Sequence, residues 1–155
     1  MAGIRAPQQI AVGARSKKTA ANQNIADSAE TAITFPDGAS FDVGTGSRMY
    51  AAGSPTKLTC RVGGVYIIWA SLRFAANATG VRRALLRVNG GTYLGQSPPV
   101  PGTAAIATFV QVVAIAKLNV GDYVEVTAIQ TSGAGLDVQA DAENVGFAAC
   151  LWGTA

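Results

Sequence analysis

The chain from Gly64 to Gly91 has the pattern of two long strands joined by a short turn of small residues. In its first half every second side chain is apolar, and this set comprises Tyr66, Ile68, Ala70, Leu72 and Phe74. A period of two indicates a strand with one face in a core. The opposite face is also apolar at Val65, Ile67 and Trp69 before it turns polar. We expect a neighbouring subunit to cover that half-face, or else a loop of the same subunit.

Short strand patterns separated by turn residues fill the chain from residue 22 onward, and no window of ten residues has a helical period. The sequence therefore predicts an all-β domain. Segment 103–118 is apolar on both faces, with Ile106, Val110 and Val112 on one and Phe109, Val113 and Ile115 on the other. Such a strand belongs inside a sandwich or against another subunit. The predicted strands are Thr31–Phe35, Leu58–Val62, Tyr66–Ala75, Arg82–Asn89, Thr103–Leu118, Tyr123–Gln130 and Val145–Trp152.

Charge divides the chain into a basic arm and a nearly neutral body. The net charge is +3, and the only charged residues among positions 1–26 are Arg5, Arg15, Lys17 and Lys18. The arm mixes Gly, Pro, Ala, Gln and Ser without periodicity, so by itself it does not offset the entropy lost on ordering. We therefore expect an extended arm over residues 1–21, ordered on a partner, and one domain over residues 22–155.

Composition excludes several classes of protein. An apolar content of 49% with 14% charged residues excludes disorder, and no apolar run approaches the roughly 20 residues of a membrane span. The N-terminal segment lacks the continuous apolar stretch of a secretory signal, so we expect the protein to remain where it is made or to leave by cell lysis. Because the chain has no histidine, it lacks the usual general base and the commonest zinc ligand. We predict that it is not an enzyme.

No cofactor, metal or nucleic acid is predicted as a ligand. The acidic residues Asp37, Asp42, Asp137, Asp141 and Glu143 match no calcium loop in their spacing. Arg83 and Arg87 share one face of a strand, which we interpret as a solvated sheet face because no aromatic residue accompanies them for stacking on bases. Cys60 and Cys150 lie in apolar surroundings and are interpreted as buried free thiols, with a disulfide between them as the alternative.

Several segments together resemble a known family. They are GVY at Gly64–Tyr66, FAANATG at Phe74–Gly80, RALLRVNG at Arg83–Gly90, LNVGDYVEV at Leu118–Val126 and GFAACLWG at Gly146–Gly153. The chain is similar to the globular-head domain of complement and the tumour necrosis factor superfamily, in the form found in bacteriophage structural proteins. The resemblance implies a jelly-roll β-sandwich of about ten strands, with the last strand central in the inner sheet, that forms a compact trimer through that sheet.

The function implied by this resemblance is structural. We expect a virion protein made in the host cytoplasm and carried on the capsid surface, a trimeric decoration or cement protein that binds the major capsid protein and stabilises the phage head. The expected trimer interface is Val65, Ile67, Trp69 and Trp152, and the expected capsid contact is Arg5, Arg15, Lys17 and Lys18. The alternative is a receptor- or glycan-binding knob of a phage tail or head fibre, whose partner would be a glycan on the host surface.

Overall fold

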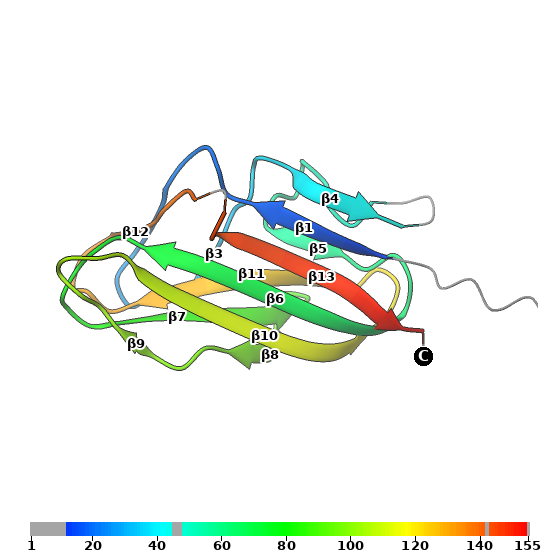
Figure 1. Ribbon diagram of the computed structural model, residues 1–155. Coiled ribbons are helices and arrows are strands. Elements are labelled where there is room, and N and C mark those ends of the chain that lie inside the picture. Colours follow the sequence, from blue (N-terminus) through cyan, green and yellow to red (C-terminus); the bar gives the residue numbers. More distant parts are fainter. Residues whose placement is uncertain (1–11, 45–47, 142, 155) are drawn as a thin grey trace, which may run out of the picture.

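The computed structural model describes residues 12–44, 48–141 and 143–154, in which the chain forms thirteen strands and no helix (Figure 1). The predicted all-β class is confirmed. The described part of the chain holds no helix of the length and hydropathy that a membrane span needs. The strands are β1 (Gly13–Lys17), β2 (Gln23–Ile25), β3 (Thr31–Ala32), β4 (Ala39–Val43), β5 (Lys57–Thr59), β6 (Gly64–Phe74), β7 (Val81–Val88), β8 (Thr92–Gln96), β9 (Val100–Pro101), β10 (Thr108–Leu118), β11 (Tyr123–Gln130), β12 (Leu136–Val138) and β13 (Gly146–Gly153).

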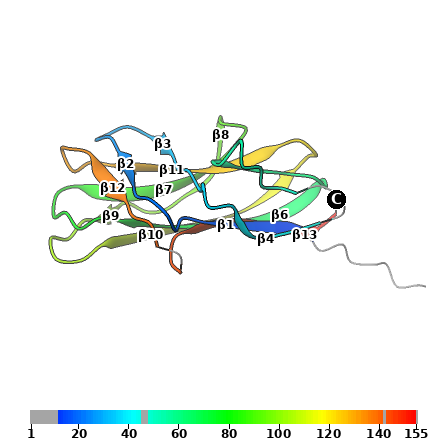
Figure 2. The same cartoon turned by 90° about the horizontal axis from the view of Figure 1, so that it is seen from above.

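The strands form two antiparallel sheets that lie one above the other, as Figure 2 shows. Sheet A has seven strands in the order β2-β12-β6-β13-β1-β4, with β10 beside β6 along the length of both strands. Sheet B has six strands in the order β3-β11-β7-β8, with β5 beside β11 and β9 beside β7. Two packed sheets of antiparallel strands are the architecture of a β-sandwich, as predicted.

The sequence located the long strands closely and the short ones poorly. β11 has the predicted bounds, and β6, β7 and β13 differ from prediction by one or two residues at each end. The predicted strand 103–118 is shorter, because residues 102–107 form a loop in which the Thr103 hydroxyl donates to the Ile106 carbonyl at 2.9 Å. Ile106 is therefore exposed in a loop, whereas Val110 and Val112 are buried.

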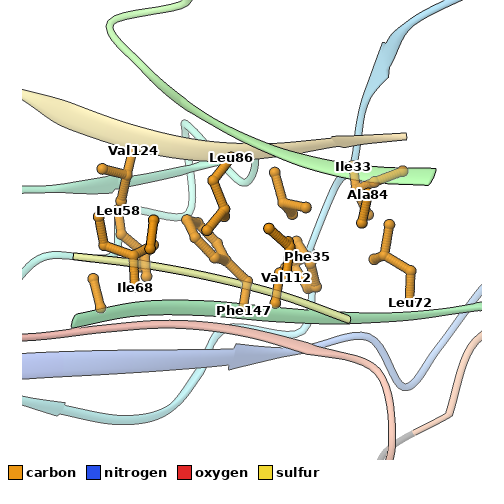
Figure 3. Close-up of a cluster of buried hydrophobic side chains, with 14 of the residues drawn as sticks. Ile33, Phe35, Leu58, Ile68, Leu72, Ala84, Leu86, Val112, Val124 and Phe147 are labelled. Carbon is orange, nitrogen blue, oxygen red and sulfur yellow. The ribbon is translucent and has the colours of Figure 1, made fainter. Parts of the chain in front are cut away.

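The core lies between the sheets and contains the whole apolar set that the sequence predicted for β6. The side chains from Tyr66 to Phe74 at every second position are fully buried. β13 adds Phe147, whose ring centroid lies 5.8 Å from that of Phe35, and Figure 3 shows Phe147 and Ile68 pointing toward Leu86 and Val124 of sheet B. Each sheet therefore contributes one apolar face to a single core.

The predicted boundary between arm and domain is wrong by about ten residues. β1 lies inside sheet A, where Gly13 pairs with Cys150 of β13 on one side and with Val43 of β4 on the other. The strand is stabilised mainly by backbone hydrogen bonds to two neighbours and buries little more than Ala14 and Ser16. Its sequence, GARSK, therefore needs no apolar periodicity and did not indicate a strand. Residues 1–11 lie outside the described residues, so the arm stays a prediction there.

One hairpin turn and one close contact between strands depend on particular residues. Asn89 and Gly90 join β7 to β8 with φ values of 53° and 70°, the left-handed region expected for a tight hairpin turn. At the start of β6, a Cβ on Gly64 would lie 2.4 Å from the Gly153 carbonyl oxygen. Gly64 therefore allows the close approach of β13 to β6.

The arginines of β7 point in opposite directions. Arg83 and Arg87 lie on the outer face of sheet B, as predicted, whereas Arg82 is fully buried. The Arg82 guanidinium donates hydrogen bonds to the carbonyls of Thr79 at 2.9 Å and Asn77 at 3.1 Å. Arg82 thus holds the β6–β7 loop, and its burial lowers the pKa of the guanidinium.

Candidate functional site

The outer face of sheet A, which points away from the core, is the candidate site. Residues that pair across antiparallel strands project to the same face, so the register places side chains in rows. One row runs Val43, Gly13, Cys150, Ile67 and Ile115 across the five strands from β4 to β10. The next row along the strands runs Phe41, Arg15, Ala148, Trp69 and Val113. Of these ten residues, Arg15 alone has a charged side chain. The polar groups among the other nine are the Cys150 thiol and the Trp69 indole N–H.

This face is apolar and uncovered in the single chain. Val113 is 62% exposed, Ile115 72% and Trp152 72%. Val65, Ile67, Ile115 and Trp152 line a shallow hollow of about 250 Å³. We call the following residues the apolar face: Phe41, Val43, Val65, Ile67, Trp69, Val113, Ile115, Ala148, Cys150 and Trp152. Contiguous apolar surfaces of this kind mark interaction sites, because a monomer in water gains nothing from exposing them.

The relief of the face follows from side-chain size. Its centre, along β1 and β13, carries the small residues Gly13, Ala148 and Cys150, and beside them Arg15, whose guanidinium lies over Trp69. Larger apolar side chains stand on both sides, on β6 and β10 toward one edge and on β4 toward the other. A row of large side chains from another surface therefore has a lower strip against which to pack.

The face becomes polar toward the other end of the strands. Ser71 and Gln111 form the next row, and beyond it Arg73 pairs with Phe109. The Arg73 guanidinium lies 5.7 Å from the Phe109 ring centroid and donates to the Asp141 carboxylate at 2.9 Å. Hydrogen bonds from the Asn144 side chain, followed by those from nearby backbone amides and Arg73, hold the pKa of Asp141 below its usual value. The half-apolar pattern of β6 in the sequence thus describes a real gradient along the face.

Sheet B presents a different outer face, in which polar groups are already partnered. The Glu30 carboxylate accepts hydrogen bonds from Arg87 and Tyr93, both at 2.7 Å, and from the Thr127 hydroxyl. Partial burial raises the pKa of Glu30, but the hydrogen bonds from Thr127, Tyr93 and Arg87 outweigh it, so the net shift is downward. The outer face of sheet B therefore suits water, and that of sheet A suits another protein surface.

The four residues predicted for a trimer interface all lie on the apolar face. The prediction omitted Val113, Ile115 and the β4 residues Phe41 and Val43. The sequence could have indicated Val113 and Ile115, since segment 103–118 is apolar on both faces. It gave no indication of the β4 residues, because ASFDV is short and its partner β1 was assigned to the arm.

The basic residues predicted to contact a capsid are not together on a tether. Arg5 lies outside the described residues. Arg15 and Lys17 belong to β1, and the Arg15 guanidinium lies 5.7 Å from the Trp69 ring centroid. Lys18 is 1% exposed, and its Nζ donates to the Thr34 carbonyl at 3.2 Å, so it is not available as a surface contact. Burial lowers the pKa of Lys18, although the nearby Asp37 carboxylate opposes this shift.

The cysteines form no disulfide, and the acidic residues form no cluster that could bind a metal ion in the described part of the chain. Both cysteines are free, Cys60 buried as predicted and Cys150 exposed on the apolar face, contrary to prediction. β13 alternates, so Cys150 points outward between the inward-facing Ala149 and Leu151. In the described residues no three His, Cys, Asp or Glu side chains are grouped so that they could hold a metal ion.

Comparisons with known proteins give a fold. No protein-family model and no curated protein matches the chain. The chain is similar to the structure of Eiger TNF from S. frugiperda, with a TM-score of 0.61, 12% identity, and coverage of 95% of this chain and 96% of that one. Murine APRIL at pH 5.0 gives a TM-score of 0.64 with 11% identity over 92% of this chain and 99% of that one. The globular domain of zebrafish complement 1qA gives a TM-score of 0.57 with 15% identity over 95% and 100%. The chain therefore has the jelly-roll β-sandwich fold of these tumour necrosis factor and complement globular domains.

Proposed function

We propose that the protein is a structural protein that assembles as a homotrimer through the apolar face. The observation that carries this proposal is the contrast between the two sheets. The outer face of sheet A is apolar and uncovered, with Ile115 and Trp152 each 72% exposed, whereas polar groups on the outer face of sheet B are hydrogen-bonded within the chain. A large apolar face of this kind is the central part of a stable interface between subunits.

The relief of the face favours a cyclic arrangement. Large side chains near the β10 edge of one copy, such as Val113 and Ile115, fit the strip of small residues on β1 and β13 of the next copy. Such head-to-tail contacts between unlike surfaces form a closed ring when the rotation closes. Three copies is the number implied by the family that the sequence resembles.

For the biological role we propose a phage virion protein, made in the host cytoplasm and carried on the capsid surface as a decoration or cement protein. A trimer that contacts neighbouring copies of the major capsid protein adds buried interface to the shell. Because it binds the assembled lattice and not free subunits, it stabilises that lattice by linkage. Residues 1–11, with Arg5, together with Lys17 are the proposed fastening elements. Lys18 is not one of them because it is buried, and neither is Arg15, because it lies within the apolar face beside Trp69.

The oligomer is tested by a charge placed on the face. Ile115→Asp should dissociate the trimer, since an unpaired carboxylate at a packed apolar interface costs several kcal/mol. Val120→Asp is the matched control, because Val120 is 68% exposed in the β10–β11 turn, outside the apolar face. Analytical ultracentrifugation should give a trimer for the wild type and for Val120→Asp and a folded monomer for Ile115→Asp. A wild-type monomer at micromolar concentration would refute the proposal.

The exposed thiol gives an independent readout of which face is covered. Cys150 should react with a thiol reagent in the Ile115→Asp monomer and be protected in the trimer. The buried Cys60 is an internal reference that should react only after unfolding. Equal reactivity of Cys150 in the two proteins would place the subunit interface elsewhere.

The capsid role is tested on particles. Wild-type trimer should be retained on undecorated phage shells and should raise the temperature at which they break. A variant lacking residues 1–11 should remain a trimer and be retained less, and it leaves β1 intact. Equal retention would remove the arm from the proposal, and failure of both proteins to bind any shell would remove the capsid role.

One feature favours the alternative of a glycan-binding knob. Trp69 and Phe109 line a hollow of about 320 Å³ together with the polar side chains of Ser71, Gln111, Glu143 and Asn144. Aromatic surface combined with a few convergent hydrogen-bonding groups is the general composition of a small-ligand site. Binding to an array of bacterial surface glycans that is lost in Gln111→Ala, in a protein that binds no shell, would favour this alternative.

A further inference from the structure

Three exposed basic residues lie at one end of the sandwich, where β1 begins and β13 ends. They are Arg48, Arg61 and Lys117, and we call them the basic end. Arg61 lies in the turn before β6, and its Nε donates to the Arg48 carbonyl at 2.8 Å, which places Arg61 beside the backbone at residue 48. Lys117 pairs with Val65 near the start of β6. In Figure 1 this is the end at which β1 starts and β13 ends.

These three charges have no acidic partner among the described residues. Arg15, Lys17, Lys57 and Arg83 are also outside the ion pairs of the described chain, but Arg15 and Lys57 lie over the rings of Trp69 and Tyr123, and Arg83 donates to Gln96. Arg73 and Arg87 form ion pairs with Asp141 and Glu30. Lys18 and Arg82 are buried and donate to backbone carbonyls. Within residues 12–44, 48–141 and 143–154, no carboxylate lies within ion-pair distance of Arg48, Arg61 or Lys117.

Acidic residues at the same end are occupied by the backbone. The Asp42 carboxylate accepts the N–H groups of Met49 at 3.0 Å and Tyr50 at 2.9 Å. Asp122 accepts the N–H of Asn119 at 2.7 Å and the side-chain amide of Asn89 at 2.8 Å. These carboxylates hold turns and form no ion pair with the basic end, and they keep their negative charges beside it.

The opposite end of the sandwich carries acidic side chains instead. Asp27 accepts the N–H of Gly133 in the β11–β12 loop, and Asp137 accepts hydrogen bonds from Asn22 and Asn24. Asp141 and Glu143 lie in the loop before β13. Carboxylates therefore outnumber cations at this end, where Arg73 is paired with Asp141, and cations outnumber carboxylates at the basic end.

We propose that the basic end is a docking surface for a carboxylate-rich protein surface, and that the trimer presents three copies of it side by side. The second part rests on the proposed function. A rotation about a cyclic axis leaves the height of each atom along that axis unchanged, so all three basic ends lie at one level. Three weak contacts on one rigid body bind together far more tightly than one.

A folded acidic protein fits this surface better than a nucleic acid does. Each copy offers three separated cations, with Asp42 and Asp122 nearby. A duplex carries one negative charge per roughly 1.7 Å of its axis, and strong binding takes about 6–10 phosphate contacts on one continuous basic surface. Carboxylates spaced over a protein surface can lie opposite the three cations and avoid the two acidic side chains.

The experiment compares Arg61→Glu with Arg83→Glu. Both substitutions reverse one arginine and change the net charge equally, but Arg83 is half-buried on the outer face of sheet B, away from the basic end. The probes are an immobilised random copolymer of glutamate and alanine, duplex DNA, and vesicles containing phosphatidylserine. We expect wild-type protein to bind the copolymer with an affinity that falls with salt. Arg61→Glu should weaken this binding about tenfold, and Arg83→Glu less than about twofold.

Three outcomes would overturn the inference. Equal weakening by both variants would mean that only net charge matters, and tighter Arg61-dependent binding to DNA or to vesicles would assign the basic end to those partners. Ultracentrifugation of the same samples separates this inference from the proposed function. If the protein is monomeric but Arg61→Glu still weakens binding selectively, the trimer fails and the docking surface stands. If the variants are trimers that bind equally, the docking surface alone fails.

Discussion

Trp152 and Phe147 lie on opposite faces of β13, and we expect their replacement by alanine to have opposite effects. Trp152 is 72% exposed on the apolar face of a single chain, whereas Phe147 is 1% exposed and packs on Phe35 in the core. Trp152→Ala should therefore weaken assembly and leave the fold intact. Phe147→Ala should destabilise each subunit by about 3–5 kcal/mol.

The magnitude for Trp152 follows from the area that assembly would cover. A tryptophan buries on the order of 200 Å². Covering an exposed fraction of 72% then removes about 145 Å², which at about 25 cal/mol per Å² is close to 3.5 kcal/mol per subunit. Allowing for the surface that alanine keeps, a trimer loses about 9 kcal/mol in all. Because the midpoint concentration of trimer formation varies as the square root of its dissociation constant, it should rise roughly a thousandfold.

The assay is sedimentation equilibrium over a concentration series, with urea unfolding of the same samples followed by tryptophan fluorescence and circular dichroism. Trp152→Ala should shift the assembly midpoint and leave the free energy of unfolding of dilute, monomeric protein within about 0.5 kcal/mol of wild type. An unchanged assembly midpoint would refute the assignment of this face. Loss of subunit stability in Trp152→Ala would mean that the indole belongs to the fold.

Three further predictions concern the subunit itself and are best measured in the Ile115→Asp background. Arg82→Met should lower the free energy of unfolding by about 2–4 kcal/mol in urea, because the carbonyls of Asn77 and Thr79 lose buried donors, while Arg83→Met on the same strand should change it by less than about 0.5 kcal/mol. Gly80→Ala should be strongly destabilising by thermal unfolding, since φ is +69° there and an added Cβ would overlap the Thr131 carbonyl; a melting temperature within two degrees of wild type would contradict the geometry. Because the pKa of Glu30 is lowered below 4.5 in the folded state, its ionised form stabilises the fold above that pH, and this contribution is lost as the pH falls through the lower folded value. Glu30→Gln should therefore flatten the decline in stability below pH 4.5, and an unchanged acid titration of stability would argue against the Arg87 and Tyr93 contacts.

The sequence predicted those strands whose own pattern of apolar residues is enough to identify them. β6 and β11 have a sustained apolar pattern over eight or more residues, so their class was predicted, and their bounds were predicted to within two residues. Strands of two or three residues, such as β3 and β9, are fixed by neighbours distant in the chain and leave no period to detect. β1 is the clearest case, because pairing with β4 and β13 makes GARSK a strand and removes it from the predicted arm.

The candidate site could be predicted for the same reason and only to the same extent. Val65, Ile67 and Trp69 are more apolar than the solvated face of a strand needs to be. The sequence of β6 therefore predicted part of the apolar face. The rows that extend it to Val43 and Phe41 depend on register across β1, which no local pattern encodes. The buried position of Lys18 had no signal either, because it depends on Thr34 and Asp37 from another segment. The basic end arises in the same way, from residues that are far apart in the chain until both sheets have formed.

The central place of β13 in sheet A has a consequence for biosynthesis. Residues 146–153 pair with β6 on one side and with β1 on the other, so the strand that joins these two segments is synthesised well after both of them. Until then β6 and β1 each expose an unpaired edge and an uncovered core face to other nascent chains. The chain closes its core through contacts of large sequence separation, which makes folding slow. A premature stop before residue 146 should therefore yield aggregates that engage chaperones, and not a smaller folded domain.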